Sequence, residues 1–281
     1  MPYRCFKEKS LDPFLIREPT VISFSGGRTS AYMLWRVLQS NGGLPDEAMV
    51  IFCNTGKEVE PTLEFVRDCE DNWGCKINWL EYRNPLSFTQ VDFDTASRNG
   101  EPFEMIVEHR KMLPNTRARF CTAELKVRTM SRFMKSLGHT EWDNMIGIRA
   151  DEPQRFARMK PDYRGENPVM PLYHAGVTKQ EVIKFWSENS FELKLPIING
   201  ETIEGNCDLC FLKSLPKIVS LVKDKPEKAD WWAKMEKRAE GWTSGDGNKF
   251  RNDRPPYAKI HNFVDRQMDM FDDSIACFCG D

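Results

Sequence analysis

Two sets of residues in this sequence have the types and spacing needed for chemistry. The first is a run of hydroxyl and glycine residues near the N-terminus that includes one arginine. Adjacent glycines let a backbone turn closely around a ligand, and the N–H groups at the start of a following helix attract anions. Arginine and hydroxyl side chains add hydrogen-bond donors, so we expect this run to hold phosphate. Its members are Ser25, Gly26, Gly27, Arg28, Thr29 and Ser30.

The second set consists of cysteines. The chain has 9 of them, an odd number that favours reduced thiols, a metal site or redox chemistry over a disulfide framework. Cys207 and Cys210 form a C-x-x-C pair, whose spacing suits zinc or an iron–sulfur cluster. A thioredoxin-like redox pair has the same spacing, but its usual place near the start of a small βαβ domain is missing here.

The glycine run is expected to lie between a strand and a helix. Residues 20–24 are mostly β-branched or apolar, and an amphipathic pattern predicts a helix from about residue 29 to 39, before a glycine stop. Further strands are expected at 48–53 and 76–81, with a helix between them. This alternation predicts a parallel sheet, in which ligands bind beyond the carboxyl ends of the strands. The second strand opens there into Asn54, Thr55 and Gly56.

A fourth strand, expected at 143–149, ends in an arginine. Between His109 and Arg164 the sequence has thirteen Lys or Arg residues and six Asp or Glu, although the net charge of the chain is -2. We therefore expect a local surface that attracts anions rather than only a solvated basic helix face. Arginine can bind an oxyanion through two parallel hydrogen bonds, which makes three residues here candidates for phosphate or sulfate binding. They are Arg149, Arg155 and Arg158.

These segments resemble one known superfamily. Residues 25–30 resemble the SGGxD[ST] pyrophosphate loop of the N-type ATP pyrophosphatases and phosphoadenosine-phosphosulfate (PAPS) reductases, with Thr29 where ATP-splitting members usually carry Asp. Residues 52–66 resemble the DTG.E…T..FV segment that lies beside adenosine in the PAPS reductases, and 147–158 resemble their G.R..E…R segment. The resemblance implies a Rossmann-like α/β fold of the adenine nucleotide α-hydrolase type. It implies a nucleotide-binding domain over 1–195 and a small helical, cysteine-bearing part over 196–281.

The cysteines resemble those of two groups in this superfamily. Cys121 lies in a segment similar to the CT..LK segment of the DNA-phosphorothioation sulfurtransferases and to the CC…K segment of the adenylylsulfate reductases. Thr122, next to it, is expected to cap a helix that reaches about Leu137. In both groups this cysteine and the later C-x-x-C bind a [4Fe–4S] cluster, with zinc as the alternative for this chain. The implied ligands are Cys121, Cys207 and Cys210, with Cys277 or Cys279 from the tail as the fourth.

Two reactions on an adenine nucleotide follow from the resemblance. In the favoured one, the loop holds the pyrophosphate of ATP, with Mg²⁺ as a candidate cofactor and Arg28 and Lys126 as catalytic residues. AMP passes to an acceptor on nucleic acid, and sulfur from a donor protein then replaces it. In the alternative, the nucleotide is an adenylyl sulfate and Cys279 takes its sulfur, because Cys279-Gly280 resembles the ECG.H end of sulfonucleotide reductases. A third interpretation is a non-catalytic protein that binds adenine nucleotides.

The composition is that of an ordinary globular enzyme, with 40% hydrophobic and 29% charged residues. No apolar run approaches the roughly 18–20 residues that span a bilayer. Residues 1–9 also lack the apolar core of a signal peptide. We therefore expect a cytoplasmic protein without a membrane partner, and the sequence leaves its oligomeric state open.

Overall fold

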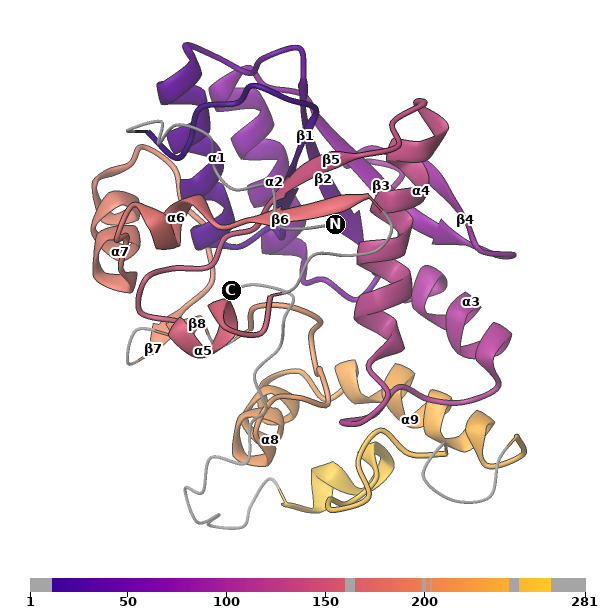
Figure 1. Cartoon of the computed structure of the whole chain (residues 1–281). Coiled ribbons are helices and arrows are strands. Elements are labelled where there is room, and N and C mark those ends of the chain that lie inside the picture. The colour runs from indigo at the N-terminus through magenta and orange to yellow at the C-terminus, as the bar shows by residue number, and fades with distance from the viewer. Residues whose placement is uncertain (1–11, 160–164, 199–200, 203, 243–247, 264–281) are drawn as a thin grey trace.

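The structure is a computed structural model that describes residues 12–159, 165–198, 201–202, 204–242 and 248–263. Its centre is a six-stranded sheet in the order β4-β3-β2-β1-β5-β6, with helices around it (Figure 1). Neighbouring strands run parallel except at one edge, where β3 and β4 pair antiparallel. The expected α/β fold is confirmed, whereas the antiparallel edge strand was not expected. The strands are β1 (Thr20–Phe24), β2 (Ala48–Asn54), β3 (Ile77–Arg83), β4 (Ser87–Val91), β5 (Trp142–Met145) and β6 (Glu166–Val169).

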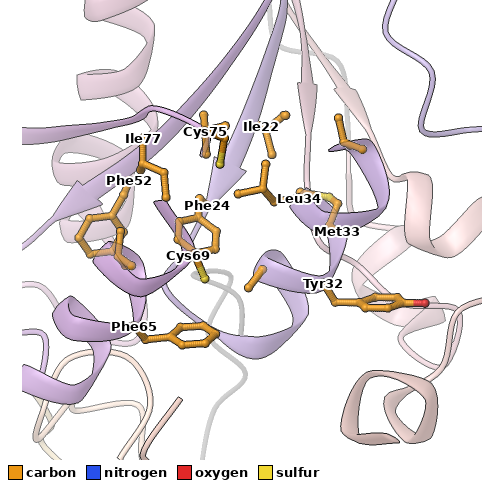
Figure 2. Packing of buried hydrophobic residues seen from close by; sticks show 14 of the residues in the cluster. Ile22, Phe24, Tyr32, Met33, Leu34, Phe52, Phe65, Cys69, Cys75 and Ile77 are labelled. Carbon is orange, nitrogen blue, oxygen red and sulfur yellow. The ribbon is translucent and has the colours of Figure 1, made fainter. Parts of the chain in front are cut away.

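One face of the sheet is covered by α1 (Arg28–Asn41) and α2 (Glu60–Trp73). Phe24 of β1 and Phe52 of β2 point into this layer beside Phe65 of α2, as Figure 2 shows. Because side chains alternate along a strand, every second residue of β1 and β2 reaches this core. Burial of this apolar face holds α1 against the end of β1.

The other face is covered by α4 (Thr129–Ser136), which packs on Val21 and Ile51. The seven residues before α4, Thr122–Arg128, form a π-helical segment. The expected helix cap at Thr122 is wrong, because the helix already includes residue 120. The hydroxyl of Thr129 donates to the carbonyl of Glu124, five residues earlier, at 2.8 Å. This bond accompanies the wider π-helical turn.

The direction in which strands are added reverses at β1. The chain runs from β1 outward through β2 and β3 to β4, then returns to β5 on the other side of β1. Open α/β sheets bind ligands beyond the carboxyl ends of the strands at such a reversal. The expected strand at 143–149 is shorter, since β5 ends at Met145. Beyond it the backbone of Gly147 approaches α1, and a Cβ there would lie 3.4 Å from the Cα of Ser30.

Three short or medium helices follow β5. The longest, α7 (Lys179–Glu188), begins at Thr178, which forms a capping box with Glu181. Trp186 of α7 donates its indole N–H to the carbonyl of Arg28 at 2.9 Å, so α7 is tied to the start of α1. The other two are α5 (Pro153–Phe156) and α6 (Pro171–His174).

The C-terminal part shares a hydrophobic core with α3 (Glu101–Arg110). Phe103 of α3 lies 5.9 Å from Trp232 between ring centroids, and both are fully buried. In Figure 1 these C-terminal helices lie below the sheet, with α9 close to α3. The proposed division into 1–195 and 196–281 stays a prediction. The C-terminal elements are β7 (Ile197–Ile198), β8 (Glu201–Thr202), α8 (Leu215–Asp224), α9 (Lys228–Ala239) and a 3-10 helix (Tyr257–Phe263).

The C-x-x-C pair lies in a turn before α8. A helix is expected to start near Leu209, but α8 starts at Leu215, and the hydroxyl of Ser214 accepts the N–H of Lys217 at 3.4 Å. Lys213 holds the preceding turn closed, because its Nζ donates to the carbonyl of Cys207 at 2.9 Å. Within the described ranges, no helix has the length and apolar character needed to cross a membrane.

Candidate functional site

The loop between β1 and α1 lies at the point where the strand order reverses. Gly27 precedes the helix in an extended conformation and brings no side chain to its N-terminus. The hydroxyl of Ser30 accepts the N–H of Ser25 at 3.1 Å and lies 2.9 Å from the Ser25 hydroxyl. The loop is therefore closed on itself beside the positive end of the α1 dipole. This arrangement suits an anion.

Gly26 is required for the shape of this loop. Its φ is +77°, a left-handed conformation that L side chains rarely adopt. A Cβ at this position would lie 2.7 Å from Cγ2 of Thr62 on α2. The loop therefore approaches α2 so closely that only glycine fits.

Arg28 is engaged away from the loop backbone. The residue is 6% exposed, and its guanidinium donates to the carbonyls of Leu193 and Leu195 and, at 3.1 Å, to the Thr202 hydroxyl. Burial lowers the pKa of Arg28, an effect that nearby Glu192 opposes. The structure thus places this candidate catalytic residue as an anchor for Leu193, Leu195 and Thr202.

Thr29 connects the loop to the segment that follows β5. Its hydroxyl accepts a hydrogen bond from Nη1 of Arg149 at 3.0 Å. Nε of Arg149 donates to Asp151 at 2.9 Å, and Nη1 lies 3.6 Å from the carboxylate of Glu152. Arg149 therefore reaches the β1–α1 loop, with its charge partly offset by two carboxylates.

The other two candidate arginines lie further along the same segment. Arg155 forms an ion pair with Glu152 and does not contact the loop in the contacts described here. Arg158 is exposed. Neither has the direct link to α1 that Arg149 has.

The loop after β2 is held by buried hydrogen bonds. Nδ2 of Asn54 donates to Glu81 at 2.7 Å and to the carbonyl of Ser97 at 2.8 Å. Its Oδ1 accepts the N–H of Gly56 at 3.0 Å. Gly56 has a φ of +75°, and a Cβ there would lie 3.0 Å from the Cα of Gly100. Asn54 and Gly56 therefore shape this loop, whatever else they contact.

Thr55 brings this loop to the C-x-x-C turn. Its hydroxyl lies 3.5 Å from Sγ of Cys207 and donates to Glu58 at 3.2 Å. Nζ of Lys126 lies 3.4 Å from the same Glu58 carboxylate, and Glu58 and Cys207 form an antiparallel backbone bridge. Burial and the charge of Glu58 raise the pKa of Cys207. Three sequence-predicted residues, Thr55, Lys126 and Cys207, therefore lie around one carboxylate.

Cys121, Cys207 and Cys210 all pack against the C-terminal hydrophobic cluster. The N–H of Cys210 donates to the carbonyl of Cys207 at 3.2 Å, which forms the C-x-x-C turn. Thiols are the donor type that iron–sulfur clusters and zinc use. Within the part of the chain that the structure describes, however, no group of three or more Cys, His, Asp or Glu residues is arranged to hold a metal ion. The candidate fourth ligands, Cys277 and Cys279, lie outside the described residues.

Sequence reasoning missed the role of two buried ion pairs. Glu58 was noticed only as part of a motif, although Lys126 contacts it directly. Lys57 lies 3.0 Å from Asp208 of the C-x-x-C turn, and both side chains are almost fully buried. The two partners of each pair are far apart in the sequence, so no local pattern could have indicated them.

Glu124 explains part of the expected basic surface. It is fully buried and forms ion pairs with Arg110, Arg128 and Arg132. Burial opposes its charge, but hydrogen bonds from Arg110 and Arg132 outweigh this effect and lower its pKa. The four-residue spacing from Glu124 to Arg128 and on to Arg132 was the available signal, because such residues share a helix face. Because three arginines surround one carboxylate, the group around Glu124 keeps a net positive charge.

Comparison with known proteins matches residues 19–194 to the phosphoadenosine phosphosulfate reductase domain. The chain is 32% identical over 218 residues to the uncharacterized nin region protein ORF290 of Escherichia phage lambda, covering 73% of this chain and 70% of that protein. It is 27% identical over 165 residues to the uncharacterized protein MJ0066 of Methanocaldococcus jannaschii, covering 57% of this chain and 30% of that protein. A solved phosphoadenylyl-sulfate (PAPS) reductase from Candida auris, in a phosphate complex, aligns with a TM-score of 0.46 at 16% identity, over 66% of this chain and 82% of that one. The domain match covers the sheet and its helices and ends before β7.

Proposed function

Because the chain belongs to the phosphoadenosine phosphosulfate reductase domain family, we propose that it binds an adenine nucleotide, ATP, and uses it to activate a sulfur transfer. The acceptor is a nucleic acid, as in the DNA-phosphorothioation sulfurtransferases that the cysteine segments resemble. The main structural support for this proposal is the β1–α1 loop. Its closed shape at the strand reversal, with α1 starting at a side-chain-free Gly27, supports binding of the pyrophosphate of ATP.

The reaction has two displacement steps. An oxygen of the acceptor attacks the α-phosphorus of ATP, pyrophosphate leaves, and AMP is joined to the acceptor. A sulfur nucleophile supplied by a donor protein or by sulfide then takes the place of AMP, which leaves with the acceptor oxygen. Lys126 lies between the loop after β2 and the C-x-x-C turn, where its ammonium group faces the Glu58 carboxylate. A cation there supports stabilisation of developing negative charge on phosphate oxygens.

A [4Fe–4S] cluster is part of this proposal, with zinc as the alternative. Cys121, Cys207 and Cys210 would ligate it, together with Cys277 or Cys279. Its support is the packing of the three described cysteines on one hydrophobic cluster, together with the family resemblance. When bound, such a cluster supplies a place where sulfur can be held. The protein's own contribution is the C-x-x-C turn. This turn is held beside the loop after β2 by the Lys57–Asp208 ion pair and by the backbone bridge between Glu58 and Cys207.

A second candidate function is reduction of an adenylyl sulfate, in which a thiolate of Cys279 takes the sulfur. One observation favours it. Thr29, at the position where ATP-splitting members carry Asp, has its hydroxyl bonded to Arg149. Mg²⁺ is usually bound through carboxylate oxygens, which a hydroxyl paired with a guanidinium does not supply. This pair therefore suits an anion that binds without Mg²⁺ better than it suits a metal-bound triphosphate.

Nucleotide binding is tested by calorimetric titration of ATP into the wild type and two Gly27 variants. The extended conformation of Gly27 accepts a side chain. In Gly27→Asp the new carboxylate caps α1 and occupies the anion position, so ATP affinity should fall at least about tenfold while thermal stability is kept or raised. Gly27→Ala is the matched control and should bind ATP nearly as the wild type does. Equal ATP affinity in Gly27→Asp and Gly27→Ala would show that the β1–α1 loop does not bind the pyrophosphate of ATP.

A further inference from the structure

Three arginines from two helices surround the buried carboxylate of Glu124. Arg128 ends the π-helical segment, Arg132 follows it on α4, and Arg110 comes from the last turn of α3. Figure 1 shows α3 beside the chain that leads into α4, and the two segments are in contact. Because α4 covers the face of the sheet opposite α1 and α2, this group is separate from the β1–α1 loop.

The group carries more positive than negative charge. Three guanidiniums and one carboxylate leave a net charge of +2. Among the ion pairs of the described residues, Glu124 is the only carboxylate that contacts these arginines. The acidic residue of α3 nearest to them in the sequence, Glu108, is matched by Lys111 and Arg238. The excess charge therefore creates a local positive potential that attracts anions.

The arginines keep both surface and hydrogen-bond donors for a further anion. The side chains of Arg110 and Arg128 are 38% and 36% exposed, although both reach the fully buried Glu124. Nη1 of Arg132 has no hydrogen-bond partner among the described residues. A guanidinium has five N–H donors, so contacts to one carboxylate use only part of them. Since converging like charges repel each other, a second anion on the exposed side would stabilise the group.

A fourth cation extends the group along α4. Lys135 follows Arg132 by three residues, and Arg132 follows Arg128 by four, so the three share one face of the helix. Lys135 is exposed, and its side chain forms no ion pair within the described residues. At about 1.5 Å per residue, the distance from Arg128 to Lys135 is about 10 Å, which is longer than a single phosphate needs. Arg110, Arg128, Arg132 and Lys135 together form a basic stripe.

One end of the basic stripe lies beside the cysteine-bearing segment. The Arg110 guanidinium lies 5.8 Å from the centre of the Phe120 ring, and Cys121 follows Phe120 directly in the chain. Lys126, in the same π-helical segment as Arg128, reaches the carboxylate of Glu58. A polyanion bound along the stripe would therefore run toward the residues of the proposed sulfur transfer.

We infer that the basic stripe binds the phosphate backbone of the nucleic acid that accepts the sulfur. The acceptor class rests on the proposed function, whereas the stripe and its charge are features of the described residues. Arginine suits this role because its planar guanidinium can bind two phosphate oxygens at once. Glu124 holds the guanidiniums in place from beneath. Because phosphate contacts carry no sequence information, the stripe binds acceptor strands with little base preference.

The test is fluorescence anisotropy with labelled single-stranded DNA and RNA of about 12 nucleotides. The full-length wild type is compared with the double variant Arg128→Gln/Lys135→Gln, which leaves Glu124 with two arginines. The control is Arg67→Gln/Lys184→Gln, which removes the same two residue types from α2 and α7, outside the stripe. We expect the stripe variant to bind at least about tenfold more weakly, with a salt slope smaller by about 0.7 for each lost phosphate contact. The control should stay close to the wild type.

A second variant, Lys135→Glu, leaves the group around Glu124 untouched. Its fold should be kept, because the Lys135 side chain is exposed. The reversed charge should weaken oligonucleotide binding at least about threefold. Wild-type affinity in Lys135→Glu would contradict the inference.

Three further results would overturn the inference. They are equal weakening in the two double variants, no oligonucleotide binding by the wild type, or displacement of the oligonucleotide by inorganic phosphate or poly-glutamate at equal concentrations of charge. The last result would assign the stripe to free phosphate or to an acidic protein. ATP titration of the same variants separates this inference from the proposed function. Unchanged ATP affinity in the stripe variant is expected, whereas loss of ATP binding in Gly27→Asp concerns the β1–α1 loop alone.

Discussion

The hydroxyl of Thr29 at the start of α1 accepts a hydrogen bond from Nη1 of Arg149, 3.0 Å away. These two residues are 120 positions apart in the sequence. The contact joins the loop after β1 to the segment after β5, the two strands that flank the reversal of strand order. The residue that distinguishes this loop from the ATP-splitting pattern is thus held by an arginine of the same site.

Replacing Thr29 tests how the loop balances charge. In Thr29→Asp the new carboxylate would pair with Arg149 and add negative charge where we propose that the phosphate of the nucleotide binds. We expect ATP affinity without metal to fall about tenfold, which corresponds to about 1.4 kcal/mol. Thr29→Ser keeps the hydroxyl and should bind within about twofold of the wild type. Titration in the presence of a chelator measures both, and an unchanged affinity in Thr29→Asp would place the phosphate elsewhere.

Arg28 is expected to stabilise the fold by anchoring Leu193, Leu195 and Thr202. Arg28→Met would leave the buried carbonyls of Leu193 and Leu195 without this donor, at a cost of about 2 kcal/mol. Denaturant unfolding should show this loss, and amide hydrogen exchange should speed up at 193–202.

The control for Arg28 is Arg36→Met on the same helix. The Arg36 guanidinium packs 4.3 Å from the centre of the Phe14 ring and does not contact 193–202 in the described contacts. Exchange at 193–202 should therefore match the wild type in Arg36→Met. Equal exchange there in the two variants would argue against the anchoring role of Arg28.

Glu236 on α9 makes stability depend on pH. Burial raises its pKa from 4.5 to about 7, although the N–H of Tyr257 donates to its carboxylate at 2.7 Å. Since the folded-state pKa is raised, the stabilising contribution is complete below about pH 4.5 and is lost as pH rises through about 7. One pKa unit corresponds to about 1.4 kcal/mol, so the change is on the order of 3 kcal/mol.

The measurement for Glu236 is the unfolding free energy between about pH 5 and pH 8. Glu236→Gln keeps the carbonyl oxygen that accepts the Tyr257 N–H but cannot ionise. The wild type should lose stability relative to this variant as pH rises. Parallel pH profiles for the two proteins would show that Glu236 does not titrate in this range.

The cluster proposal predicts about four iron and four sulfide ions per chain after anaerobic purification. Cys207→Ser should lose both the metal and the visible absorption. Cys69→Ser is the matched control, because Cys69 is a fully buried thiol on α2, away from the C-x-x-C turn. A colourless protein that carries zinc would contradict the iron–sulfur assignment, and equal metal loss in both variants would contradict the ligand role of Cys207.

The parts of the fold that depend on local sequence were predictable. The strand at Thr20–Phe24 and the helix from Arg28 follow from apolar spacing and a glycine turn, and the parallel pairing of β1, β2 and β3 follows from the βαβ alternation. The edge strand β4 was missed because its residues are mostly half-exposed and lack strict alternation. The late start of α8 was missed because an apolar, helix-compatible sequence continues through a turn that Lys213 holds by hydrogen bonds to backbone carbonyls.

The site was predictable only as separate segments. The glycine loop, Thr55, Arg149 and the C-x-x-C pair each have a local pattern, so their residue types could be identified. Their contacts arise from packing between distant segments. Examples are the hydrogen bond from Arg149 to Thr29 and the approach of Thr55 to Cys207 across 152 positions. Arg28 has the residue type of a phosphate ligand, yet its partners are carbonyls 165 and 167 positions away.

The most direct test of the central claim is product analysis with ATP and an adenylyl sulfate in parallel reactions. Each contains single-stranded oligonucleotide, Mg²⁺, sulfide and a thiol reductant, with the wild type, Gly27→Asp or Gly27→Ala. We predict pyrophosphate and AMP from ATP, retained in Gly27→Ala and lost in Gly27→Asp, and no sulfite from the adenylyl sulfate. Sulfite release without pyrophosphate would contradict it and establish the sulfonucleotide reductase alternative, and the absence of both products would contradict catalysis of either kind.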